Sequence, residues 1–169
     1  MKAFPLILTL KLEDSAQVRF DELRKKHFPK HCNYMDAHLT LFHHLPSGLA
    51  SVSQAITSFA SRPAMDLEVT AVKNIGNGVV YSISSAELQR MHKQMQKNFD
   101  RLLISQDRQK LWPHITVQNK VTAYKALLTF NELQKDFQPY QIEATGLSSW
   151  LYLGAAWEWI RDDLFQAQE

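Results

Sequence analysis

Cysteine is almost absent from this sequence. Cys32 is the only cysteine among the 169 residues, so a disulfide within the chain is impossible. A cluster of thiolate ligands around a metal ion needs several cysteines and is excluded as well. Long apolar runs are also missing, since none approaches the roughly 18 residues that a membrane-spanning helix needs. We therefore expect a protein without membrane spans.

An excess of charge of one sign is lacking too. Lysine and arginine number 19, aspartate and glutamate 17, and the formal net charge is +2. This is too mild for a protein that coats long nucleic acid, but it is compatible with a local basic pocket for a short anionic ligand. A short apolar stretch near the start is followed by Lys11, Glu13 and Asp14 instead of a cleavage site. We therefore expect a strand there and a cytoplasmic protein.

The apolar spacing divides the chain into alternating strands and helices. A length of 169 residues favours one domain over residues 1–169. The mixed order of elements predicts an α+β or α/β class. Period-two runs and buried runs predict strands at Phe4–Leu12, Ala37–Leu45, Met65–Val72, Val79–Ser84, Pro113–Val121, Tyr140–Tyr152 and Trp157–Phe165; helical spacing predicts helices at Glu13–Phe28, Ser51–Phe59, Ala86–Ile104 and Thr122–Phe137.

A strand–helix–strand pattern occurs twice. Its first copy covers residues 4–45 and its second covers residues 79–121. Such self-similarity predicts two related lobes that face each other.

The second strand of each copy carries the same four-residue motif. Residues 38–41 are His-Leu-Thr-Leu, and residues 114–117 are His-Ile-Thr-Val. Side chains alternate across a strand, so the histidine and threonine of each motif share one face and the apolar residues share the other. If the lobes are related by a pseudo-twofold axis, the two polar faces meet across a groove.

Two imidazoles and two hydroxyls in one groove suit a phosphodiester. One neutral histidine takes a proton from the attacking oxygen, and the other, as imidazolium, gives a proton to the leaving oxygen. Hydroxyls of Thr40 and Thr116 donate hydrogen bonds to non-bridging phosphate oxygens. No metal is needed, and neither motif has an adjacent carboxylate to hold one. A single His-x-Thr means little, but two matched copies favour the functional interpretation.

Strict alternation extends both polar faces. It adds Phe42 and His44 to the first face and Gln118 and Lys120 to the second. Lys120 is a weaker candidate for phosphate binding, although a solvated lysine is as common. Phe42 is a weaker candidate for stacking on a base or forming the groove floor, although a strand aromatic is more often core. His43 and His44 point to opposite faces and cannot both enter the groove.

Paired His-x-Thr-x motifs on duplicated β-α-β lobes resemble the two-histidine (2H) phosphoesterase superfamily. Its members include the 2′-5′ RNA ligase-like proteins and phosphodiesterases that act on 2′,3′-cyclic or ADP-ribose 1″,2″-cyclic phosphates. The resemblance implies a bilobal α+β fold with two antiparallel-type sheets facing a central groove. It implies no metal and no cofactor, with His38 and His114 as the catalytic pair and Thr40 and Thr116 as phosphate binders. Some members have an arginine shortly after a motif, where this chain has other residues.

The expected function is that of an enzyme: metal-independent hydrolysis of cyclic phosphates on RNA ends or small nucleotides, or cleavage and joining of 2′-5′ RNA linkages. The alternative is a non-catalytic module that binds a nucleotide or RNA end in the same groove. A third interpretation is a metal-binding protein built on the seven histidines. The local set of His27, His31 and Cys32 lacks a clear fourth ligand. The partner is thus a nucleotide or RNA end, and we expect a monomer without a protein partner.

Overall fold

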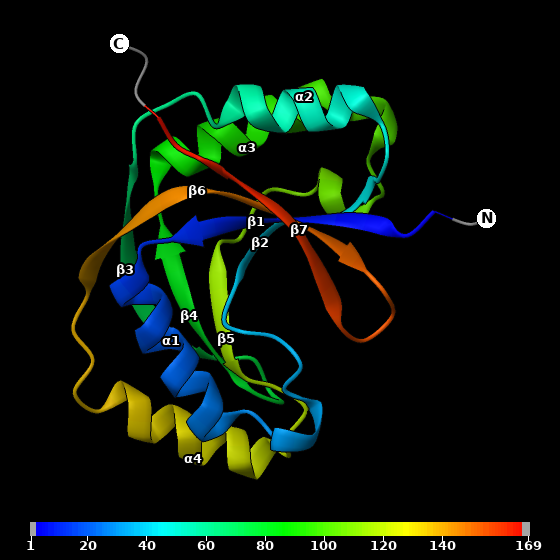
Figure 1. The fold of residues 1–169 in the computed structure, drawn as a ribbon. Coiled ribbons are helices and arrows are strands. Elements are labelled where there is room, and N and C mark those ends of the chain that lie inside the picture. Colours follow the sequence, from blue (N-terminus) through cyan, green and yellow to red (C-terminus); the bar gives the residue numbers. More distant parts are fainter. Residues whose placement is uncertain (1–2, 167–169) are drawn as a thin grey trace.

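The computed structural model describes residues 3–166, which form an α+β fold (Figure 1). Strands and helices follow one another in the predicted order, and every strand pairing is antiparallel. Within the described residues, no helix is long and apolar enough to cross a membrane. The elements are β1 (Pro5–Leu12), α1 (Asp14–His27), β2 (Leu39–Pro46), α2 (Ala50–Phe59), β3 (Met65–Asn74), β4 (Val79–Ser84), α3 (Ala86–Asn98), β5 (His114–Gln118), α4 (Ala123–Gln134), β6 (Tyr140–Tyr152) and β7 (Trp157–Leu164), with short 3-10 helices at Lys30–Cys32, Asp100–Leu102 and Gln106–Arg108.

Local signals explain where the helices begin and end. The Ser85 hydroxyl accepts the backbone N–H of Leu88 and caps α3. The Thr122 hydroxyl caps α4 in the same way, by accepting the backbone N–H of Lys125. Helix α1 ends just before Pro29, which cannot continue a helix. The prediction for α3 was too long because apolar residues keep helical spacing through the 3-10 turn at Asp100–Leu102.

The strands belong to one sheet, which corrects the expectation of two facing sheets. The seven-stranded sheet runs β2-β1-β6-β3-β4-β5, and β7 also pairs with β6. Strand β6 is 13 residues long and joins two halves of the sheet, one formed by β1 and β2 and the other by β3, β4 and β5. Its Ala144 lies opposite Leu12 of β1 on one edge and opposite Met65 of β3 on the other. The two motif strands, β2 and β5, are therefore the two ends of the sheet path.

The β1–β2 and β4–β5 pairs have the same register irregularity. Thr9 lies opposite Thr40, but Leu8 lies opposite Phe42, so Leu41 is an extra residue in β2. In the other pair Val80 lies opposite Thr116, but Val79 lies opposite Gln118. Each motif threonine is thus followed directly by a β-bulge, which reverses the in-and-out alternation of the residues that come next in the strand.

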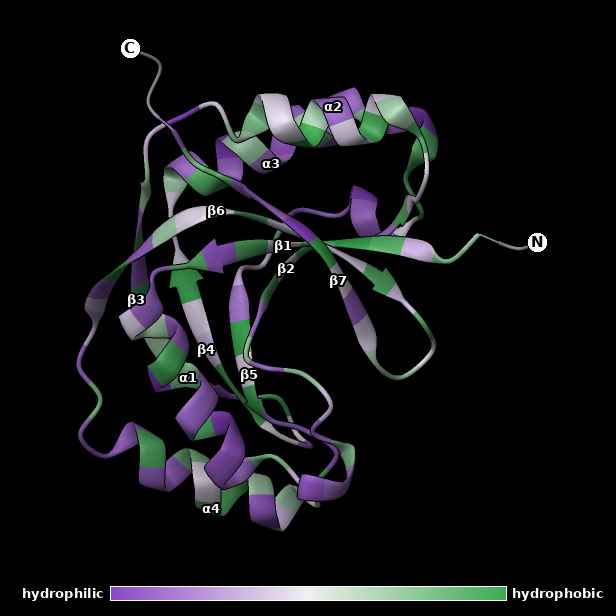
Figure 2. Cartoon of the chain, viewed as in Figure 1, coloured by the Kyte–Doolittle hydropathy of each residue, from purple (hydrophilic) through white to green (hydrophobic). Residues whose placement is uncertain are grey.

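The helices pack in two groups on the sheet (Figure 1). Helices α2 and α3 contact each other at one end, whereas α1 and α4 lie at the other and are joined by an ion pair between Lys26 and Glu132. Hydrophilic and hydrophobic segments alternate along the helices (Figure 2), and the apolar residues Val52 and Ile56 of α2 are buried. Helix α1, which follows β1, packs against β5 of the other half.

Candidate active site

The structure brings both histidines and both threonines of the motifs to one cavity. His38 immediately precedes β2, and His114 is the first residue of β5. Together with Thr40 and Thr116 they line a cavity of about 410 Å³, which we call the histidine cavity. All four side chains are half-buried, so they are accessible from the cavity while their strands anchor them in the sheet.

Each histidine makes the same hydrogen bond to the backbone. Nδ1 of His38 lies 2.8 Å from the carbonyl oxygen of Asp36, and Nδ1 of His114 lies 2.7 Å from that of Trp112. A carbonyl oxygen can only accept, so each Nδ1 carries the proton. The tautomer of both rings is thereby fixed, and each Nε2 is left to exchange a proton with a ligand.

An indole ring lies against each imidazole. The Trp157 ring centroid is 4.5 Å from that of His38, and the Trp112 centroid is 4.2 Å from that of His114. Trp157 begins β7, so the last strand of the sheet completes the site formed by the first half. These contacts hold the orientation of each imidazole ring and exclude water from one of its faces.

The surroundings of His38 strongly disfavour its charged form. Burial, together with the charges of Arg24, His114 and His43, lowers the pKa of His38 to about 4, against the opposing hydrogen bond to Asp36. His38 is therefore a neutral imidazole near neutral pH.

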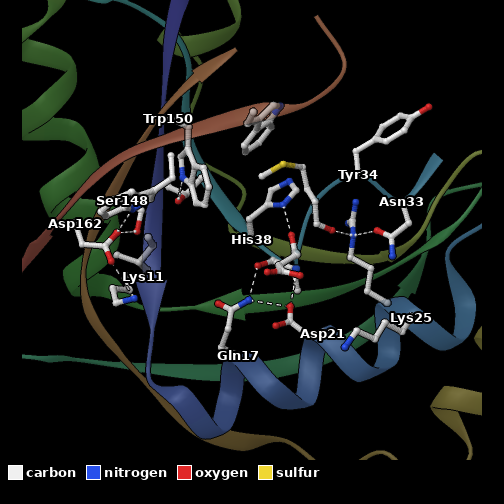
Figure 3. Close-up of a pocket in the computed structure, with 18 residues that line it drawn as sticks. Lys11, Gln17, Asp21, Lys25, Asn33, Tyr34, His38, Ser148, Trp150 and Asp162 are labelled. Atoms are coloured by element: carbon white, nitrogen blue, oxygen red, sulfur yellow. Dashed lines mark hydrogen bonds and ion pairs between the residues drawn. The ribbon is translucent and has the colours of Figure 1, made fainter. Parts of the chain in front are cut away.

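Helix α1 holds the loop that leads to His38 (Figure 3). Asp21 Oδ1 accepts the backbone N–H of Ala37 at 2.8 Å, and Gln17 Nε2 donates to the Ala37 carbonyl at 2.7 Å. Gln17 Nε2 also donates to Asp21 Oδ1 at 2.9 Å. Burial raises the pKa of Asp21, and the hydrogen bonds from Ala37 and Gln17 oppose that rise. Both backbone groups of the residue before His38 are thus fixed by one turn of helix.

Two buried side chains cross from the helix of one half to the motif strand of the other. Arg24 of α1 is only 6% exposed and donates from Nη1 to the Thr116 carbonyl at 3.0 Å. Its Nε also donates to Asn33 and to the Met35 carbonyl in the loop before His38. In the opposite sense, His92 Nε2 of α3 donates to the Leu41 carbonyl at 3.0 Å. Neither residue could be predicted from the sequence, because no local pattern marks contacts over 92 and 51 positions.

The bulges overturn two of the expected positions. Phe42 is fully buried and stacks on His92 with the ring centroids 4.7 Å apart, so it belongs to the core and does not line the histidine cavity. Lys120 is exposed, lies beyond the end of β5 at φ 59°, and does not line the cavity either. Gln118 is buried and donates to the Thr129 hydroxyl. None of Phe42, Gln118 and Lys120 therefore extends a polar face into the cavity.

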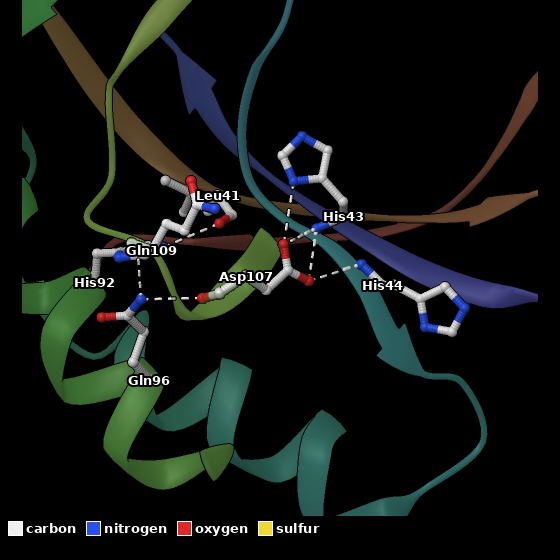
Figure 4. A network of polar contacts seen from close by, with 7 residues as sticks. All are labelled: Leu41, His43, His44, His92, Gln96, Asp107 and Gln109. Atoms are coloured by element: carbon white, nitrogen blue, oxygen red, sulfur yellow. Dashed lines mark hydrogen bonds and ion pairs between the residues drawn. The ribbon is translucent and has the colours of Figure 1, made fainter. Parts of the chain in front are cut away.

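The same reversal exchanges the roles expected of the two adjacent histidines. His43 lines the histidine cavity, whereas His44 is exposed outside it. Between them lies Asp107 (Figure 4), whose carboxylate accepts the backbone N–H of His43 at 2.9 Å and of His44 at 2.9 Å. Nδ1 of His43 lies 3.1 Å from the same carboxylate. Burial alone would raise the pKa of Asp107, but these hydrogen bonds hold it below its ordinary value.

A second cavity shares His38 and Trp157 with the first (Figure 3). Its volume is about 610 Å³, and we call it the tryptophan cavity because Trp150 and Trp159 also line it. An ion pair between Lys11 and Asp162, 3.2 Å long, lies in its wall. His38 thus has open space on two sides.

The set of His27, His31 and Cys32 does not converge on a common point. His27 is buried in α1, and the Cys32 thiol lies 3.6 Å from the Pro29 carbonyl. Among residues 3–166, no three histidine, cysteine, aspartate or glutamate side chains are grouped so that they could hold a metal ion.

Comparison with known proteins identifies the family. The model of the 2′-5′ RNA ligase superfamily matches residues 12–156, and the chain therefore belongs to this superfamily. The structure is similar to that of TT0787 from Thermus thermophilus, with a TM-score of 0.67 and 12% identity over 98% of this chain and 100% of that one. It is also similar to E. coli LigT complexed with 3′-AMP, with a TM-score of 0.60 and 14% identity over 99% and 100%. At 12% and 14% identity, these similarities show a shared fold and nothing about activity. No protein of curated function matches the chain.

The low pKa of His38 predicts that its imidazole stays neutral in the free protein down to about pH 5. In the unfolded chain the ring titrates near ~6.5, so the unfolded state binds more protons between about pH 4 and 6.5. The free energy of unfolding should therefore fall as the pH is lowered through this window. An NMR titration of the His38 Cε1–H resonance, assigned with a His38→Asn variant, measures the pKa directly. A midpoint near 6.5 would contradict the prediction.

Replacing Arg24 should damage fold and site together. Arg24→Met leaves Asn33 and the Met35 and Thr116 carbonyls without their donor, and we expect a loss of about 2–4 kcal/mol in the free energy of unfolding. The matched control is Arg19→Met, because exposed Arg19 lies on the same helix, with its guanidinium over the Tyr140 ring at 4.1 Å from the ring centroid. Denaturant unfolding measures both. Equal stability of the two variants would show that Arg24 does not brace the halves.

Proposed function

We propose that this protein is a metal-independent phosphoesterase that acts on the cyclic phosphate of an RNA end or a small nucleotide, and that makes or cleaves 2′-5′ linkages by the same steps. The observation that carries the proposal is the matched pair of Nδ1 hydrogen bonds, which leaves one Nε2 on each of two histidines in a single cavity. General acid–base catalysis of phosphoryl transfer needs one proton acceptor and one proton donor, and this arrangement supplies both.

In hydrolysis, a water oxygen attacks the phosphorus of the cyclic diester and its proton passes to Nε2 of His38. The bond between phosphorus and one ribose oxygen breaks as Nε2–H of His114 protonates that oxygen. The product is a phosphate monoester beside a free hydroxyl, with His38 cationic and His114 neutral until solvent restores them. A ribose 5′-hydroxyl in place of water gives a 2′-5′ linkage by the same proton transfers.

The assignment of His38 as the base rests on its neutral state in the free protein. A base with so low a pKa is weak, but a bound phosphate places negative charge beside the ring and raises its proton affinity during the reaction. Thr40 and Thr116 donate to the non-bridging oxygens, where charge increases in the transition state.

The relatives support a nucleotide as the ligand. E. coli LigT has been crystallised with 3′-AMP, NADP+, ATP and phosphate, and its fold covers 97% or more of this chain in each case. The tryptophan cavity beside His38 offers further room for the part of a substrate that extends beyond the phosphate, and indole rings are suitable surfaces for a base.

His38→Ala and His114→Ala should each lower turnover of adenosine 2′,3′-cyclic phosphate by about 10²–10⁴, the usual contribution of a positioned acid or base. The double variant should be little worse than either single one, because the two groups act as a unit. His44→Ala is the matched control and should keep the wild-type rate, since His44 lies outside the cavity. The assay is a steady-state measurement in excess EDTA.

Two outcomes would redirect the proposal. Full activity in either single variant would remove that histidine from the mechanism. Binding of 3′-AMP without turnover of any cyclic phosphate or 2′-5′ linked dinucleotide would support the non-catalytic binding module instead.

A further inference from the structure

The histidine cavity contains more anion-binding groups than one phosphate requires. Beyond the two motifs, its wall includes His43, Lys110 and Trp112. The cavity has one carboxylate, that of Asp107, which is 3% exposed and already accepts four hydrogen bonds. A ligand in this cavity therefore meets many donors and no free negative charge, which favours an anion with more than one charged group.

His43 lines the cavity with one ring nitrogen bound to Asp107 and the other free to meet a ligand. Its Nδ1 contacts the Asp107 carboxylate, which can only accept, so Nδ1 carries a proton and the ring is held in one orientation. Figure 4 shows the other ring nitrogen at the far end of the imidazole, pointing away from Asp107. The His43 side chain is 46% exposed, whereas the Asp107 side chain is 1% exposed. Its Nε2 is thus accessible to a ligand.

The position of His43 relative to the motif fixes how far apart two bound groups would be. His43 follows Thr40 by three residues, at most about 10 Å along an extended strand. Its charge is near enough to lower the pKa of His38. A second anionic group of the same small ligand can therefore reach His43 while the first lies between the two motif histidines.

We propose that His43 and Lys110 form a second phosphate subsite, which makes the protein prefer nucleotides that carry a further phosphate beside the one at His38 and His114. This inference rests on the proposed function and names its substrate class: a terminal nucleotide with a 5′-phosphate, as at the end of an oligoribonucleotide. In its imidazolium form, His43 donates from Nδ1 to Asp107 and from Nε2 to the second phosphate. The exposed ammonium of Lys110 adds a mobile positive charge.

The test compares two ligands that differ only in the second phosphate. Binding of 3′-AMP and of adenosine 3′,5′-bisphosphate is measured by calorimetry at about pH 6 and constant ionic strength. The wild-type protein should bind the bisphosphate about 10-fold more tightly, the effect of one charge-assisted hydrogen bond at a half-exposed site. His43→Asn keeps a donor near the Nδ1 position for Asp107 but removes Nε2, and it should reduce the preference to about 1–2-fold. Lys110→Met should reduce it in the same direction.

His44→Asn is the matched control. His44 is the adjacent histidine and its backbone binds the same carboxylate, but its side chain lies outside the cavity, so the preference should remain at the wild-type value. Equal affinity of the wild-type protein for the two ligands, or an unchanged preference in His43→Asn, would overturn the second subsite while leaving the proposed function intact. Failure of 3′-AMP to bind at all would overturn both.

Discussion

The hydrogen bonds that cross between the two halves of the sheet are the interactions on which the site depends. Strands β2 and β5 are the two ends of the sheet path, so strand pairing does not bring them together. Arg24 of α1 donates to the Thr116 carbonyl and to the loop before His38, while His92 of α3 donates to the Leu41 carbonyl. Each helix thereby fixes the motif strand of the other half, and the two histidines come to line one cavity.

Burial of these groups has a consequence for the chemistry. Arg24 braces the site from close by, and its positive charge lowers the pKa of His38 in addition to desolvation. Both effects keep the imidazole neutral. A cation that braces the two halves thus also helps to keep the His38 imidazole neutral. Asp107, which also lines the cavity, stabilises the bulged backbone of β2 and fixes the ring of His43.

The order of elements and the two motifs could be predicted from the sequence because they depend on local spacing. The α+β class is confirmed, and the family resemblance is confirmed by the match over residues 12–156. The extension of the first polar face to Phe42 was wrong because strict alternation does not anticipate the bulge after Thr40, and Lys120 does not continue the second face because β5 ends at Gln118. Arg24 and Asp107 could not be found, since each contacts residues more than 60 positions away in the chain. The single sheet was also missed, because the pairing of β6 with both halves is a long-range property.

We propose that His38 and His114 face one bound phosphate. Titration of the protein with inorganic phosphate, with the imidazole nitrogen and Cε1–H resonances of both residues followed by NMR, shows whether they do. A single site between the two rings predicts that both sets of resonances shift along curves with the same dissociation constant, and that His38→Ala weakens the response of His114. Movement of only one histidine, or two different dissociation constants, would contradict a shared phosphate site.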